Sequence, residues 1–134
     1  MTKNKDTQKP VGYPIGDFLV RIKNVVRAKR HSVEVKNTKI IEAMAKVLKE
    51  EGYLSEITKS GSILSVSVAY RKKEPLILDI NLVSKPGLRV YMGASELKKI
   101  RGPRRLILST PKGIMFHREA IKKNLGGEII ANLL

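Results

Sequence analysis

The chain has 134 residues, of which 42% are hydrophobic, enough for one compact domain or for two small lobes that share a core. It contains no cysteine, which excludes disulfides, thiolate metal sites and cysteine nucleophiles and fits a reducing compartment. Lysine and arginine number 27 against 12 aspartates and glutamates, so the formal net charge is +15.

Such an excess of positive charge repels itself, and a polyanion partner is the usual reason that a protein tolerates it. An anionic membrane surface is the alternative partner. However, no apolar run approaches the ~20 residues that a membrane span needs. The basic residues are also spread over the sequence and do not form one cationic amphipathic helix. The composition therefore favours a nucleic-acid-binding protein.

The N-terminal segment is predicted to be a flexible basic tail, residues 1–12, because it lacks the apolar core of a signal peptide. A helix is expected from Ile15, where apolar residues recur at helical spacing. Arg27 and Arg30 belong to a basic cluster at its end, where the helix dipole favours cations. This cluster is either a solvated face or a second phosphate contact.

A short strand around residues 33–35 is expected to precede a second helix. Asn37 or Thr38 can cap this helix, and Gly52 suits its C-terminal end. Two further strands, 54–58 and 64–70, are predicted to form a hairpin, whose turn contains Lys59.

The charged segment 71–75 contains a strand-breaking proline and is the expected boundary between two halves, across which the sheet should continue. The fold class is predicted as α/β (α+β) with two small lobes. The first lobe, residues 13–71, reads helix, strand, helix, hairpin. The second, residues 75–134, is mostly β with short helices.

The second lobe begins with an alternating strand, residues 76–82, and a turn in which Gly87 adopts positive φ. A strand at 88–91 and a short helix at 95–100, capped by Ser95, are expected to follow. The loop before the next strand holds Arg104 and Arg105, and its density of cations favours a phosphate anchor.

The most informative segment is Ser109-Thr110-Pro111-Lys112-Gly113, which we expect on a tight turn between a strand and a helix. Two hydroxyls, a lysine and a glycine on one turn suit contacts to phosphate, ribose and base edges. Tyr91 is interpreted either as a half-buried core residue or as a ring that stacks on an unpaired base. The few aromatic residues argue against an extended single-strand platform.

Enzymatic readings of the same residues have little support. Ser109 and Lys112 match the Ser-x-x-Lys pattern of some acyl-transfer enzymes, but the companion Ser-Asp-Asn and Lys-Thr-Gly elements are missing. No phosphate-binding P-loop is present. His31 and His117 are far apart and lack further ligands at metal-binding spacing, so both are expected to be solvent-exposed without metal.

Several blocks in a common order carry a resemblance to a known family. They are Pro14-Ile15-Gly16-Asp17, Lys49-Glu50-Glu51-Gly52-Tyr53, Ser84-Lys85-Pro86-Gly87-Leu88-Arg89-Val90-Tyr91, Ser109-Thr110 with Lys112-Gly113-Ile114-Met115, and Gly126-Gly127-Glu128. The chain resembles the S8 family, the eighth protein of the bacterial small ribosomal subunit, over nearly everything after the first ten or so residues.

The resemblance implies a structural protein of the cytoplasmic ribosome, with no catalysis, cofactor or small-molecule substrate. It implies direct binding to the central domain of small-subunit ribosomal RNA, contact with neighbouring small-subunit proteins and a role in early assembly. By motif match the RNA-binding residues are Ser109, Thr110, Lys112, Gly113, Gly126, Gly127, Glu128, Tyr91, Lys85 and Arg89, and the basic candidates Arg104, Arg105, Arg27, Arg30 and Lys59 join them.

Two positions depart from the family pattern. Pro111 stands where a third small hydroxyl residue is common, which removes a hydroxyl and an N–H from the turn. Phe116 stands where a capping hydroxyl is frequent, so the following helix should have a weaker cap. The alternative function is that of another basic RNA- or DNA-binding protein, such as a translational repressor or a DNA-compacting protein.

Overall fold

The computed structural model describes residues 13–77 and 79–134, so the predicted tail lies outside the described residues. The helices are α1 (Pro14–Arg27), α2 (Lys39–Glu50), α3 (Ala94–Leu97) and α4 (His117–Lys122). The strands are β2 (Ser32–Lys36), β3 (Leu54–Ser60), β4 (Ile63–Val68), β5 (Tyr70–Arg71), β6 (Glu74–Pro75), β7 (Ile80–Leu82), β8 (Tyr91–Met92), β9 (Arg105–Thr110), β10 (Gly113–Phe116) and β11 (Gly127–Leu133).

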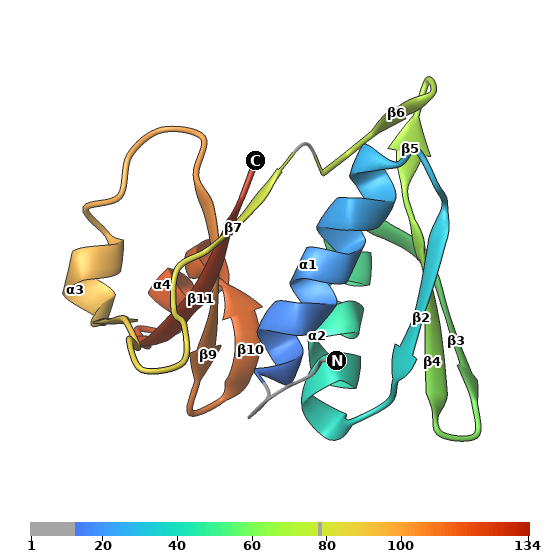
Figure 1. The fold of residues 1–134 in the computed structure, drawn as a ribbon. Coiled ribbons are helices and arrows are strands. Elements are labelled where there is room, and N and C mark those ends of the chain that lie inside the picture. The colour runs from blue at the N-terminus through green and yellow to red at the C-terminus, as the bar shows by residue number, and fades with distance from the viewer. Residues whose placement is uncertain (1–12, 78) are drawn as a thin grey trace.

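The fold is a mixed α and β arrangement, as predicted, in which α1 and α2 lie between two antiparallel sheets (Figure 1). The three-stranded sheet has the order β2-β4-β3. The five-stranded sheet has the order β10-β9-β11-β7, and β8 pairs with β11 beside this path. Whether residues 13–71 and 75–134 act as two units stays a prediction.

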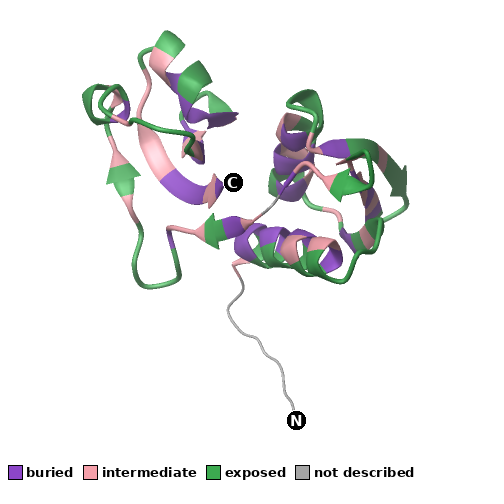
Figure 2. Cartoon of the chain, turned by 90° about the horizontal axis from the view of Figure 1, so that it is seen from above, coloured by how far each residue is buried: buried purple, intermediate pink, exposed green. Residues whose placement is uncertain are grey.

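One hydrophobic cluster joins the two sheets through the helices. Apolar faces of α1 and α2 pack against both sheets and contribute Phe18 and Met44, which are almost fully buried. Leu64 reaches this cluster from the three-stranded sheet, and Ile107 and Ile130 reach it from the five-stranded sheet. The helices and strands therefore carry most of the buried residues, whereas the connecting loops are largely exposed (Figure 2).

A second cluster covers the other face of the five-stranded sheet. Leu97 of α3 and Ala120 of α4 pack there with Leu108, Met115 and Ile129 from three neighbouring strands. The sheet is thus buried on both faces, which explains the continuous apolar run in β9. This double burial holds the C-terminal strands rigidly.

The ends of α2 agree with the sequence prediction. The Thr38 hydroxyl accepts a hydrogen bond from the Ile41 N–H at 3.3 Å, so Thr38 is the N-cap. Gly52 follows the helix with a φ of +88°, a left-handed conformation that glycine adopts without strain.

The sheet does not continue from one half to the other, so that prediction is wrong. Lys72 and Lys73 adopt positive φ and turn β5 directly into β6, which together form a separate two-stranded hairpin. The chain folds back on itself there and leaves the first sheet. Pro75 lacks an N–H, and its position in this short edge strand is one that proline tolerates.

The predicted strand-to-helix turn after Thr110 is also wrong, because the turn joins two strands. Gly113 pairs with Thr110 and Phe116 with Ile107, so β9 and β10 form a hairpin and α4 begins only at His117. A short apolar run such as Ile114–Phe116 does not distinguish a strand from the start of a helix. Phe116 occupies the N-cap of α4 without a side-chain cap, as expected.

Smaller corrections concern the second lobe. The helix expected at 95–100 begins at Ala94, and the Glu96 carboxylate, not Ser95, accepts a hydrogen bond from the Gly93 N–H at 3.1 Å. The strand expected at 76–82 is confined to β7, and residue 78 lies outside the described residues. The strand expected at 88–91 is short because residues 84–90 form a closed loop.

His117 is buried, contrary to the prediction that both histidines are exposed. Its Nδ1 accepts a hydrogen bond from the Leu106 N–H at 3.1 Å, next to the last register pair between β9 and β10. The imidazole therefore ties α4 to the start of β9. Burial lowers the pKa of His117, and the charges of Arg118 and Arg105 lower it further.

Stability should consequently fall in mild acid. The unfolded chain binds a proton at His117 near pH 6.5, whereas the folded chain does so only at lower pH, so the unfolded state holds more protons in between. We expect the melting temperature to drop between about pH 7.5 and about pH 5.5, and to drop less in His117→Gln, which cannot titrate. An equal drop in both proteins, followed by circular dichroism, would contradict this role.

Candidate nucleic-acid interface

The turn between β9 and β10 is held by the side chain of Thr110. Its hydroxyl donates a hydrogen bond to the Gly113 carbonyl at 2.8 Å and accepts one from the Lys112 N–H at 3.1 Å. Gly113 has a φ of +116°, a conformation that strains other residues. Pro111 and Lys112 form the exposed tip. Thr110 is therefore mainly a turn-forming residue, and Lys112 presents its charge to solvent.

Ser109, Glu128 and Tyr91 form a row across three neighbouring strands. Glu128 of β11 pairs in register with Ser109 of β9 on one side and with Tyr91 of β8 on the other. Residues that pair directly across strands project from the same face of a sheet. The row brings together segments from three separate parts of the sequence. Tyr91 is 67% exposed, so its ring is available to a partner.

Gly126 and Gly127 are required by the close approach of neighbouring backbones. A Cβ on Gly127 would overlap the Ser109 carbonyl oxygen, and one on Gly126 would lie against the Met92 carbonyl and the Gly93 Cα. The role of the glycine pair is thus to let β11 begin between β9 and β8. Any larger residue would push these strands apart.

The loop before β8 is closed by a buried hydroxyl. Ser84 is fully buried, and its Oγ accepts a hydrogen bond from the Val90 N–H at 2.9 Å. Lys85 and Leu88 exchange two backbone hydrogen bonds of 2.9 Å, and Gly87 takes the expected positive φ. This closed loop leads directly into β8 and presents Lys85 to solvent. No local sequence pattern predicted this role of Ser84.

Arg89 is engaged within the protein. Its Nη1 lies 3.1 Å from Glu128 Oε2, and its Cζ lies 4.5 Å from the centre of the Tyr13 ring. Burial raises the pKa of Tyr13, and the negative charge of Glu128 raises it further. Sequence reasoning assigned no role to Tyr13 and missed this contact.

Comparison with known proteins agrees with the resemblance found in the sequence. The sequence pattern of the family described as ribosomal protein S8 matches residues 13–134. The chain belongs to the ribosomal protein S8 family.

Bacterial relatives named small ribosomal subunit protein uS8 match this chain over most of their length. The relative from Mycoplasmopsis synoviae is 45% identical over 124 residues, which cover 88% of this chain and 94% of the relative. The relative from Acidobacterium capsulatum is 37% identical, and the match covers 90% of this chain and 96% of the relative. The relative from Shewanella loihica is 40% identical, and the match covers 87% of this chain and 93% of the relative.

Membership of the S8 family confirms two predictions made from the sequence. S8 proteins are structural and not enzymatic, so the prediction of no catalytic activity is confirmed. The expected location in the cytoplasmic ribosome is confirmed as well. Within residues 13–77 and 79–134, no helix is long and apolar enough to cross a membrane, and no three potential metal ligands cluster together.

The structure separates the predicted site residues of this S8 protein into two groups. The β9–β10 turn lies at one end of the molecule, together with the β3–β4 turn near which Lys59 stands (Figure 1). Lys59 forms an ion pair with Glu42 at 3.4 Å. The loop from α3 to β9 and the C-terminal end of α1 lie at the opposite end (Figure 1). The loop carries Arg104 and leads to Arg105, the first residue of β9, and α1 ends at Arg27, shortly before Arg30.

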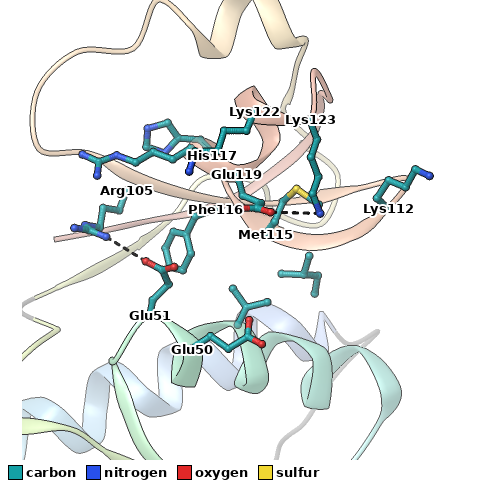
Figure 3. A pocket seen from close by; sticks show the side chains of 13 residues that line it. Glu50, Glu51, Arg105, Lys112, Met115, Phe116, His117, Glu119, Lys122 and Lys123 are labelled. Atoms are coloured by element: carbon teal, nitrogen blue, oxygen red, sulfur yellow. Dashed lines mark ion pairs between the residues drawn. The ribbon is translucent and has the colours of Figure 1, made fainter.

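A groove of about 410 Å³ runs between α2 and the β10–α4 segment. Figure 3 shows that Arg105 points across this groove to Glu51, whereas Lys112 points away from the other lining side chains. The Arg105 Nη1 and Glu51 Oε1 atoms are 3.5 Å apart, so Arg105 links the two halves of the molecule. A second cleft, of about 690 Å³, lies beside Arg27 and includes the ring pair of His31 and Tyr70.

Gly127→Ala should destabilise the protein, because the new methyl group would overlap the backbone of β9. We expect the free energy of unfolding to fall by ~1–3 kcal/mol, the range for overpacking a rigid site. Gly93→Ala is the matched control, because its Cβ would meet only Glu96 Oε1 at 3.8 Å. Equal stability of the two variants in urea denaturation would contradict the close approach.

Proposed function

We propose that this S8 protein binds the central domain of small-subunit ribosomal RNA directly and stabilises its shape early in subunit assembly. The observation that carries the proposal is the row of Ser109, Glu128 and Tyr91, which brings three of the family motifs together on one face of the five-stranded sheet. The family supports ribosomal RNA and other small-subunit proteins as partners. The net charge of +15 supports a polyanion.

Different chemical groups next to the β9–β10 turn are suited to contact different parts of the RNA. The Ser109 hydroxyl forms no hydrogen bond within the described residues and is partly exposed, so it is suited to a base edge or a 2′-hydroxyl. Tyr91 offers a ring face to an unstacked base. Lys112 and Lys85 supply phosphate attraction on either side.

An irregular, structured RNA fits this surface better than a long single strand. The described sheet edge presents one exposed aromatic ring, Tyr91, and no series of rings on which successive bases would stack. The surrounding groups are small and set by backbone geometry, as at Gly113 and Gly127. Such a surface is suited to a distorted minor groove or an extruded base.

The basic residues at the opposite end contribute a second, less specific attraction. Arg27 lines the cleft at the end of α1, Arg30 is exposed on the segment that follows this helix, and Arg104 is exposed on the loop before β9. Because these groups are far from the β9–β10 turn, they would contact a different segment of the RNA backbone. Their contribution should depend strongly on salt.

Ser109→Ala should weaken binding to a central-domain RNA fragment by ~1–3 kcal/mol, as for the loss of a specific contact, without changing the melting temperature. Thr110→Ala should weaken binding similarly and also lower the melting temperature, since the turn loses two hydrogen bonds. Thr110→Ser keeps the hydroxyl and serves as the control. Unchanged RNA affinity of both alanine variants in filter binding would contradict the assignment.

Arg104→Ala should act differently from these variants. Loss of one distributed phosphate contact should weaken binding to all RNAs similarly and lower the slope of log affinity against log salt by about one unit. A loss confined to the central-domain fragment would show instead that Arg104 reads sequence or shape.

The proposal as a whole is tested by chemical footprinting of the purified protein on complete small-subunit RNA. Protection confined to the central domain is the expected result. Preferred binding to duplex DNA or to an unrelated transcript at near-physiological salt would instead favour a DNA-compacting or repressor protein.

A further inference from the structure

The ring of Tyr13 is seated between the first helix and the five-stranded sheet. Tyr13 precedes α1 as its N-cap residue, and its ring lies directly on Gly16, where a Cβ would come within 2.5 Å of the ring. The side chain of Leu82 from β7 also lies close to Gly16, 3.3 Å from where its Cβ would be. The absence of a side chain at Gly16 therefore creates the space that the ring occupies.

Arg89 covers this ring and continues to the sheet edge. Its guanidinium lies over the ring at 4.5 Å and pairs with Glu128 at 3.1 Å. A cation above an aromatic face is attracted by the ring electrons, and a paired carboxylate neutralises its charge. Arg89 is thus satisfied on two sides by groups of the protein, which makes it a poor ligand for phosphate.

We propose that Tyr13, Arg89 and Glu128 form a latch that positions Ser109 and Tyr91 for RNA, so that Arg89 and Glu128 are positioning residues and not RNA ligands. Glu128 stands between Ser109 and Tyr91 in the strand register. Because Arg89 contacts both the Glu128 carboxylate and the Tyr13 ring, it links the row to the start of the first helix. This inference rests on the proposed function.

The latch also accounts for a carboxylate at an RNA-binding surface. A bare Glu128 would repel phosphate, whereas the Arg89 pair cancels its charge before RNA arrives. Its side chain is only 21% exposed, and the Arg89 side chain is 40% exposed. The direct alternative is that Arg89 binds phosphate and Glu128 accepts from a base amine.

Paired variants distinguish the two assignments, with filter binding to a central-domain RNA fragment as the measurement. Arg89→Gln leaves Glu128 unpaired, and we expect affinity to fall about tenfold. The double variant Arg89→Gln with Glu128→Gln keeps the net charge of the natural protein, and we expect it to bind more tightly than Arg89→Gln alone. If both residues contact RNA, the double variant will bind more weakly than Arg89→Gln alone, which overturns the latch.

Variants of the ring test the same latch without changing any charge. Tyr13→Leu should lower affinity several-fold while the salt slope stays unchanged, because no phosphate contact is removed. Tyr13→Phe should bind like the natural protein, since it keeps the aromatic ring beneath the Arg89 guanidinium. Equal affinity of the Leu and Phe variants would overturn the role of the ring.

Folding and function are separated by two further measurements. Thermal melting of each variant identifies a protein that fails to fold, and the charge-neutral double variant then decides the question. If the natural protein shows no preference for the central-domain fragment, the proposed function fails. If it shows that preference and the double variant is weaker than Arg89→Gln, the latch alone fails.

Discussion

The structure depends on the strand β11, which carries both the core and the candidate RNA surface. Successive residues of a strand point to opposite faces, so Ile129 packs in one hydrophobic cluster and Ile130 in the other. The register shift between Ile129 and Ala131 also turns Ala131 toward the cluster that holds Ile130. The same strand begins with Gly127, whose missing side chain allows β9 and β8 to lie beside it. Because the sheet is buried on both faces, this start of β11 cannot shift without disturbing the core.

Positive charge is distributed so that attraction and specificity come from different places. Exposed cations occur at both ends of the molecule, whereas the row of Ser109, Glu128 and Tyr91 occupies one end. Cations that serve the protein itself are paired with acids, as in Arg105 with Glu51 and Arg89 with Glu128. A positive charge alone therefore does not identify an RNA ligand. A lysine or arginine that has no acidic partner within the protein is the better candidate.

Sequence reasoning succeeded where local signals agree with tertiary structure. The α2 helix has an apolar face, a capping threonine and a terminal glycine, and each signal acts within a few residues. It failed where one local pattern fits two structures. The run after Gly113 became a strand because β9 offered a pairing edge, and His117 became buried because its ring bonds to the Leu106 N–H.

By itself, the sequence determined the α and β class and the family, and its charge indicated a polyanion partner, because composition, periodicity and short motifs are properties of neighbouring residues. Tertiary structure alone decided which motif residues meet. Register between β9, β11 and β8 set Glu128 beside Ser109 and Tyr91, and packing of α1 on the sheet brought Tyr13 to Arg89. Contacts between residues so far apart depend on the whole core, which no local pattern encodes.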